Sequence, residues 1–432
     1  MRWKKKRVID LKFFFGMSVQ MSKNDLLSQD VELCNPYIPA HLLETERIKL
    51  GAFYTPPHIV KKVFELIQPY YENHKEKALI ADLSAGCGAF VFPILSLGAD
   101  YRVADYDESA INFLKKFLSH EKIFHTNSLQ QASRDKFNIR EDHFLIIVGN
   151  PPYNDITSLY KKGNKGSFEC DPDLYDRDLG IAFLKLFAKL KADVICVVHP
   201  LSYLIKRANF QRLKQFTRLY KLKYGYIFPS SEFHFTKTSQ FPILIALYER
   251  DIDGMSYEYI KSFRFKFLNG EKDFVLEGLE TTDGYINKYP PRSREAKTSP
   301  IGLYFYSFRD LNSLLRNTTF IEEQKGNSVV ITLENFYKYA YLHCLKRVIL
   351  SMKKEIDYLW VYGNISPLVN KDFVEMNKKL FVISAAMDHK IFQKRKDLLQ
   401  RIFEFYRIKE SEVDLENIEK QLKAYFISLY TL

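Results

Sequence analysis

Short apolar runs alternate with helical segments over residues 59–200, and this alternation restricts the possible folds more than any other feature. Four runs are mostly apolar and of strand length: 78–83, 101–104, 144–149 and 194–199. Segments whose apolar residues recur at helical spacing lie before and between them, at 59–67, 90–97, 109–118 and 181–190. Strands of this type are buried on both faces, as in parallel sheets. The pattern predicts a doubly wound, Rossmann-like α/β sheet, with ligands bound beyond the carboxyl ends of its strands.

The pattern changes after about residue 250. Aromatic and basic residues alternate over 262–268, Asn269-Gly270 favours a hairpin turn, and 272–276 forms the returning strand. Near the end of the chain one helical stripe is apolar: Leu415, Ile418, Leu422, Tyr425 and Leu429. We therefore expect an N-terminal extension over 1–45, an α/β domain over 46–252 and a separate, mixed and largely helical domain over 253–432.

Charge and cysteine content narrow the class of protein. The 64 basic and 52 acidic residues give a net charge of +12, which suits a polyanionic partner. The five cysteines have no metal-type spacing, so we expect no metal site and a reducing compartment. No apolar run reaches the ~18 residues that would span a bilayer. The basic N-terminus lacks a signal-peptide cleavage site, and Met17 and Met21 are alternative starts.

A glycine loop follows the first predicted strand. It reads Asp82-Leu-Ser-Ala85-Gly86-Cys-Gly88, and glycines at this place let the backbone approach a ligand beside the next helix. The third glycine of the dinucleotide fingerprint is missing, which argues against NAD. Asp105 ends the second strand, about 20 positions on, where an acidic residue would hold a ribose. Together these features favour a cofactor that contains adenosine.

The third strand ends in the turn Asn150-Pro151-Pro152-Tyr153. Two prolines fix φ and remove two N–H donors, so the turn presents acceptors. The amide oxygen of Asn150 and a carbonyl near Pro151 are placed to accept both hydrogens of an exocyclic amine, with Tyr153 stacked on the ring. The turn contains no nucleophile, metal ligand or strong base. Its chemistry fits adenine N6, whose delocalised lone pair must be redirected towards the sulfonium methyl of S-adenosylmethionine.

With these motifs the chain resembles the gamma class of DNA adenine-N6 methyltransferases of restriction–modification systems. Gly51-Ala-Phe-Tyr-Thr55-Pro56, the loop from Asp82 to Gly88 and the Asn150 turn occur in the order of that class. Weaker matches lie at Asp105, at Asn127-Ser-Leu129 and over 179–184. The resemblance covers about residues 51–250, and the family places its target-recognition domain after that region.

The resemblance implies roles for individual residues. Thr55, Asp82, Ala85, Gly86, Gly88 and Asp105 would hold S-adenosylmethionine, and Asn127 would lie against its adenine, where the family often has an acidic residue. The Asn150 turn would hold the target adenine. An aromatic residue just before the predicted strand 241–248 should cover the other face of that base. Phe235 fits this spacing best, and Phe233 is the alternative. In so aromatic a chain, a phenylalanine near a strand belongs to the core more often than to a base site.

The resemblance also implies double-stranded DNA as the partner, from which the target nucleotide is flipped out. Basic residues that would contact phosphates lie in two polar segments, both of which could equally be solvated loops: Lys161 and Lys165, and Arg292 and Arg294. Base readout is expected within 255–432. We expect a bacterial, cytoplasmic enzyme, with a cognate restriction endonuclease as a further partner.

Two alternatives remain open from the sequence. The same Asn-Pro-Pro-Tyr turn serves in similar methyltransferases that act on RNA or on protein glutamine, although Gly51 to Pro56 and the large C-terminal region argue against them. Alternatively, the chain is an inactive DNA-binding specificity subunit. The intact turn and glycine loop argue against that reading.

Overall fold

The fold is built around one large, mostly parallel sheet. The computed structural model describes residues 55–153, 169–233, 240–270, 272–290, 300–306, 308–352 and 356–431. Within these ranges nine strands follow the order β3-β2-β1-β4-β5-β7-β6-β8-β9. Their bounds are β1 Ala78–Asp82, β2 Asp100–Asp105, β3 Ile123–His125, β4 Phe144–Gly149, β5 Val194–Pro200, β6 Tyr220–Pro229, β7 Pro242–Arg250, β8 Phe265–Phe267 and β9 Asp273–Phe274.

The direction of the strands determines where a ligand can bind. β1, β2, β3, β4 and β5 are parallel, whereas β7 runs antiparallel to both β5 and β6. From β1 the chain continues to β2, which pairs with β1 on one side, whereas β4 pairs with β1 on the other side. The switch point of the sheet therefore lies between β1 and β4, where ligands bind in doubly wound sheets. The predicted fold class is confirmed.

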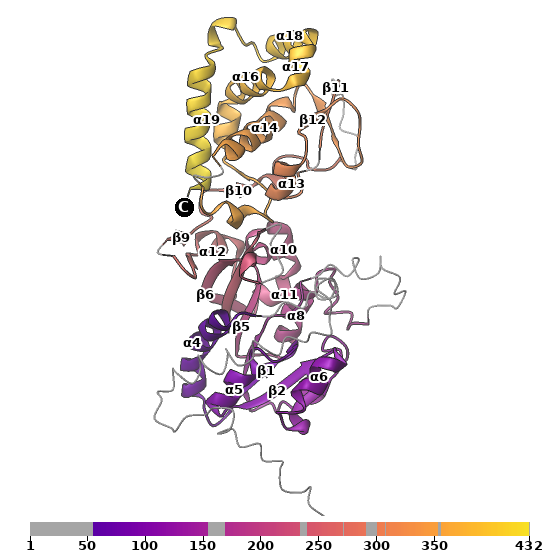
Figure 1. The fold of residues 1–432 in the computed structure, drawn as a ribbon, viewed down its shortest axis with the longest axis vertical. Helices are drawn as coiled ribbons and strands as arrows, with labels where there is room; N and C mark the ends of the chain where they lie inside the picture. Colours follow the sequence, from indigo (N-terminus) through magenta and orange to yellow (C-terminus); the bar gives the residue numbers. More distant parts are fainter. Residues whose placement is uncertain are drawn as a thin grey trace, which may run out of the picture.

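Helices cover both faces of this sheet (Figure 1). One face packs against α4 (Pro57–Asn73), α5 (Val91–Leu97) and α6 (Glu108–Leu114). The other packs against α8 (Leu179–Lys189), α9 (Ser202–Ile205), α10 (Arg207–Arg212) and α11 (Lys214–Thr217). Short 3-10 turns lie at His120–Lys122, Asp135–Phe137 and Ser230–Glu232. Because β1, β4 and β5 are buried on both faces, their apolar runs show no alternation.

Two local predictions differ from the structure in detail. The segment predicted as a helix over 109–118 leaves α-helical geometry after Leu114, and residues 115–118 continue as hydrogen-bonded turns. The helix expected over 59–67 does form, but it begins earlier, at Pro57, with Pro56 as its N-cap residue and no side chain capping it. Pro57 suits the first helical position because it lacks an N–H. The Thr55 hydroxyl is therefore available for another contact.

The chain after β7 adds to the sheet and then forms a mostly helical half (Figure 1). The predicted hairpin is confirmed: β8 pairs with β9 antiparallel, and β8 also joins β6. Small sheets pair β10 (Glu280–Thr281) with β14 (Leu368–Val369), and β11 (Pro300–Phe305) with β12 (Phe320–Ile321) and β13 (Val329–Thr332). The helices are α12 Tyr257–Ser262, α13 Leu311–Arg316, α14 Phe336–Ser351, α15 Lys371–Met376, α16 Lys378–Asp388, α17 Lys390–Lys394, α18 Lys396–Phe405 and α19 Leu415–Tyr430.

The predicted C-terminal helix is confirmed as α19. It begins after Asp414, whose carboxylate accepts a hydrogen bond from the Asn417 N–H. Ile418 and Leu422 are buried, together with Tyr425 and Leu429 further along the same face. In the described ranges, no helix is both long enough and apolar enough to cross a membrane.

The C-terminal half docks on the carboxyl edge of the sheet. The Asn364 side chain donates to Ser202 Oγ at 3.2 Å, and Asn312 donates to the carbonyl of Gln240 at 3.4 Å. Ser202 follows β5 and Gln240 precedes β7, so both contacts lie at this edge. A Cβ built on Gly363 would lie 2.5 Å from the Gln240 carbonyl oxygen, so a glycine is needed for this close approach.

Replacing Gly363 by alanine should therefore strain the junction. We expect Gly363→Ala to lower the free energy of unfolding by about 1–3 kcal/mol, the usual cost of overpacking. Gly284→Ala is the matched control, because its Cβ would meet nothing within 4 Å. It should change stability by less than about 0.5 kcal/mol. Urea denaturation measures both, and equal stabilities of the two variants would contradict the close contact.

Candidate functional site

Three of the predicted site segments meet at the carboxyl edge of the sheet. Asp82 is the last residue of β1, Asp105 is the last residue of β2, and Asn150 directly follows β4. Because these strands are parallel neighbours, their ends lie at one edge. These polar residues are far apart in the sequence, and they come together because β2, β1 and β4 are neighbours in the sheet.

Asp82 lies directly against the end of β4. Gly149 has φ +151°, and a Cβ built there would stand 3.0 Å from Asp82 Oδ1. Oδ1 also accepts a hydrogen bond from the Ser84 N–H at 3.1 Å. A side chain at position 149 would push the carboxylate away, so glycine here allows β1 and the Asn150 turn to share one site.

The glycine loop is tied to β2 through Asp105. Its Oδ2 accepts from the Gly86 N–H at 2.7 Å, and Oδ1 accepts from the Asp107 N–H at 2.8 Å. Gly88 has φ +88°, and a Cβ there would come within 2.7 Å of the Leu114 side chain. By contrast, a Cβ on Gly86 would meet nothing within 4 Å, so open space lies beside this part of the loop.

The Asn150 turn is oriented by two hydrogen bonds. Its Nδ2 donates to Thr55 Oγ1 at 3.0 Å, and its Oδ1 accepts from the Tyr153 hydroxyl. Thr55 is buried, and so is Pro151, the residue that follows Asn150. The amide oxygen therefore faces the tyrosine. The hydrogen bond between Asn150 and Thr55 joins residues 95 positions apart, which sequence spacing does not reveal.

The carboxylates at this edge are strongly perturbed. Burial, with a smaller contribution from the nearby Asp105, raises the pKa of Asp82 to about 8, and the hydrogen bond from the Ser84 N–H opposes the shift. Burial also raises the pKa of Asp105, against the N–H groups of Asp107 and Gly86. Asp82 Oδ2 and Ser84 Oγ are buried and have no hydrogen-bond partner in the described part of the chain. Such a carboxylate favours a ligand that brings a positive charge.

The hydroxyl of Tyr153 stays neutral, because burial raises its pKa above the ordinary value of tyrosine. Neither it nor the Asn150 amide can therefore act as a general base near neutral pH. The turn offers hydrogen-bond acceptors and an aromatic ring. Its chemistry is positioning.

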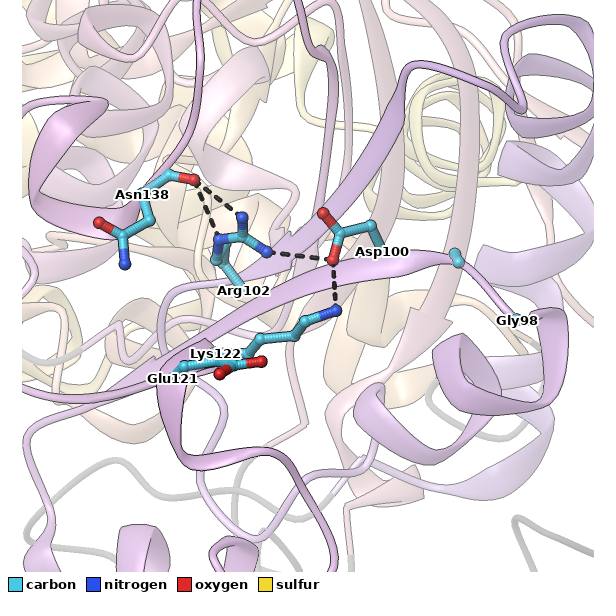
Figure 2. Close-up of a pocket in the computed structure, with 7 residues that line it drawn as sticks. Gly98, Asp100, Arg102, Glu121, Lys122 and Asn138 are labelled. Carbon is cyan, nitrogen blue, oxygen red and sulfur yellow. Dashed lines mark hydrogen bonds and ion pairs between the residues drawn. The ribbon is translucent and has the colours of Figure 1, made fainter.

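A cavity in the described ranges lies elsewhere. It holds about 550 Å³ at the start of β2, lined by Gly98, Asp100, Arg102, Glu121, Lys122 and Asn138 (Figure 2). There Asp100 accepts from Lys122 at 2.7 Å and from Arg102 at 3.1 Å. Arg102 also donates to the Asn138 carbonyl. The charges of Asp100, Arg102 and Lys122 are therefore paired with one another, at the amino edge of the sheet and away from Asp82.

Other predicted residues lie around the site or outside the described ranges. Asn127 caps the turn after β3, accepting from the Leu129 N–H and donating to the Glu169 carbonyl. Phe233 is 2% exposed and packs edge-on against Phe228, 5.7 Å between centroids, so in this conformation it lies in the core. Residues outside the described ranges are Phe235, Lys161, Lys165, Arg292 and Arg294.

Two serines were missed by the sequence reasoning. Ser84 lies in the glycine loop, and Ser128 donates to the Leu83 carbonyl at 2.7 Å, holding the segment after β3 against β1. Serine is common in loops, so neither residue carried a signal of its own.

Comparison with known proteins places this site in a family. The family model for the Eco57I restriction-modification methylase matches residues 17–234. The chain belongs to the Eco57I restriction-modification methylase family. Two type II methyltransferases of Haemophilus influenzae, M.HincII and M.HindII, are each 26% identical over 122 residues, which is 28% of this chain. That segment spans about a fifth of their own length, 21% and 20%.

Solved structures show partial likenesses. A candidate RNA methyltransferase of Pyrococcus horikoshii is 17% identical with a TM-score of 0.36, covering 55% of this chain and 100% of its own. The modification subunit of a candidate type I restriction enzyme of Vibrio vulnificus is 14% identical with a TM-score of 0.38, covering 60% and 56%.

The cofactor of this family and fold is S-adenosylmethionine. The residues at the carboxyl edge fit it. The buried Oδ2 of Asp82, which has no hydrogen-bond partner among the described residues, suits a cationic group, and the open space beside Gly86 admits a ligand close to the backbone. Asp105 accepts a hydrogen bond from the Gly86 N–H of the loop, and it lies at the strand end where doubly wound sheets hold a ribose.

The raised pKa of Asp82 predicts that cofactor binding releases a proton. At neutral pH the empty site holds Asp82 mostly protonated, since its pKa is about 8. A cation beside the carboxylate lowers that pKa, so binding strengthens as pH rises towards 8, by up to about tenfold per unit, and levels off above it. Calorimetry in buffers of different ionisation enthalpy measures the released proton. Asp82→Asn should abolish the release, and a pH-independent affinity in the unaltered protein would contradict this reading.

Proposed function

We propose that this chain transfers a methyl group from S-adenosylmethionine to N6 of a flipped-out adenine in DNA, as the modification component of a restriction–modification system. The observation that carries the proposal is the Asn150 amide. It is fixed at the end of β4 by Thr55, and its oxygen is directed at the hydroxyl of Tyr153. An acceptor held there, one strand from Asp82, suits an exocyclic amine brought to the cofactor.

Methyl transfer to an exocyclic amine requires hydrogen-bond acceptors beside the amine rather than a general base. The bound cofactor supplies a methyl group on a positively charged sulfur. Asn150 Oδ1 accepts an N–H of the target amine and favours a pyramidal nitrogen, whose developing charge it stabilises. The Tyr153 ring offers a stacking surface for the base. Because neither side chain takes the proton, the methylated amine loses it to solvent.

DNA as the substrate follows from the family and from charge. Membership in a restriction-modification methylase family supports it, and the net charge of +12 suits a polyanion. An adenine within a duplex cannot reach the end of β4, so extrusion costs a few kcal/mol that phosphate contacts must supply. The target-recognition role of residues 253–432 belongs to this proposal, as does a cognate endonuclease.

The acceptor is tested by product analysis. The purified chain is incubated with methyl-labelled S-adenosylmethionine and with DNA, RNA or protein, and nucleosides from labelled nucleic acid are separated. We expect label in DNA as N6-methyladenine, because the Asn150 turn carries no nucleophile that methylation of a carbon atom would need. Label confined to RNA or to glutamine of protein would overturn the proposal.

The role of Asn150 is tested by substitution. Asn150→Ala removes the acceptor while leaving Asp82 and the glycine loop intact, so cofactor affinity should stay within about twofold. The methylation rate should fall by about 10²–10³, as for loss of one preorganised polar group at a transition state. Asn417→Ala, at an exposed position of α19, is the matched control.

Single-turnover kinetics with calorimetry of cofactor binding separate these effects. A rate for Asn150→Ala close to that of the control would remove this amide from the mechanism. Loss of cofactor binding together with activity would instead indicate a folding role for the Thr55 contact.

A further inference from the structure

Lys206 differs from comparable lysines of the described chain. Burial lowers the pKa of four lysines there, Lys136, Lys185, Lys206 and Lys346. Three have clear partners: Lys136 donates to backbone carbonyls, Lys185 to Asp176, and Lys346 to the Asn317 carbonyl. The Lys206 ammonium has no hydrogen bond or ion pair within the described residues. A half-buried cation without a partner is costly unless a ligand completes it.

The charges around Lys206 come from the C-terminal half. Lys288 and Arg309 add positive charge, and Asp283 and Asp310 add negative charge. Both carboxylates already have partners of their own. Asp310 accepts from the Ser313 N–H at 2.7 Å and from Arg309 Nε at 3.0 Å.

Asp283 is likewise engaged. It accepts from the Thr281 hydroxyl at 2.6 Å and lies 3.8 Å from Lys288. The local balance is three cations against two engaged carboxylates. The uncompensated charge is therefore the ammonium of Lys206, which favours an anion at this place.

Lys206 stands between the proposed base site and the C-terminal half. It links α9 to α10, and Figure 1 shows α10 beside the C-terminal half. In α9, Tyr203 belongs to the apolar core against which Tyr153 of the Asn150 turn packs. On the other side, Arg207 lines a cavity of about 180 Å³ together with Thr281 and Gly284. An anion here would lie close to both the base site and the recognition half.

We propose that Lys206, assisted by Lys288 and Arg309, binds a backbone phosphate of the DNA at this junction. The inference rests on the proposed function, because it takes DNA as the substrate. A flipped nucleotide must carry its phosphates past the mouth of the site. A lysine suits a phosphate as a compact charge whose contact is independent of sequence. Lys206 is a positioning residue: it holds the strand and does not touch the reacting amine.

The test compares three variants of the full chain on plasmid DNA. Lys206→Gln removes the charge and Lys206→Arg keeps it. Lys221→Gln is the matched control: Lys221 is also half-buried, but its ammonium lies over the Tyr259 ring, 5.2 Å from the centroid, and it stands at the start of β6 on the opposite edge of the sheet. KM for DNA, kcat and cofactor affinity are measured over a range of salt concentrations.

We expect Lys206→Gln to raise KM for DNA about tenfold, with kcat and cofactor affinity nearly unchanged. The slope of log affinity against log salt should shrink by about one, because one phosphate contact is lost. Lys206→Arg should restore most of the affinity, and Lys221→Gln should behave like the unaltered chain.

The outcomes separate this inference from the proposed function. If the unaltered chain methylates DNA while Lys206→Gln keeps its KM and salt slope, the phosphate site is wrong and the proposed function stands. If Lys206→Gln falls in kcat alone, Lys206 acts otherwise than by binding phosphate, which also overturns the inference. If the unaltered chain neither binds nor methylates DNA, both fail together.

Discussion

The close approach of the Asp82 carboxylate to Gly149 is the constraint on which the site depends. Parallel pairing of β1 with β4 brings the two strand ends side by side, and the missing Cβ at 149 lets the carboxylate remain there. The same approach buries Asp82 and raises its pKa. One backbone position thus determines both the shape of the site and its demand for a positive charge.

The C-terminal half belongs to the same structural argument. It packs on the carboxyl edge of the sheet through Gly363 and Asn364, beside the segments that leave β5 and enter β7. One apolar core runs from α8 and the sheet into α14, α16 and α19. Under the proposed function, contacts at this junction would position a DNA strand relative to the Asn150 turn. The ammonium of Lys206, which has no hydrogen bond or ion pair among the described residues, lies at this junction.

Sequence reasoning succeeded where local patterns suffice. Continuous apolar runs followed by small or polar residues predicted β1, β4 and β5, and the Asn269-Gly270 turn predicted the β8–β9 hairpin. It did not predict β6, in which lysines interrupt the aromatic residues. α14 and α16 were missed because they are buried around most of their circumference, which removes the amphipathic stripe.

The placement of the predicted site residues at the strand ends followed from the sequence, whereas their contacts did not, and their roles stay predictions. The strand ends indicated Asp82, Asp105 and Asn150. Thr55 was expected to hold the cofactor, and nothing in the sequence indicated that its hydroxyl also orients the Asn150 amide. Such long-range pairs depend on the order of strands, which spacing does not encode. The core position of Phe233 was one interpretation of the sequence, but its packing partner Phe228 was not predictable, because aromatic residues are frequent throughout the chain.

The central claim is that the ends of β1, β2 and β4 form a single ligand site. A crystal structure of the chain with S-adenosylhomocysteine tests it most directly. The account predicts ligand density beside Gly86, with polar contacts to Asp82 and Asp105 and an open path from its sulfur to Asn150. Density bound elsewhere, or an Asn150 turn separated from the sulfur by packed side chains, would contradict it.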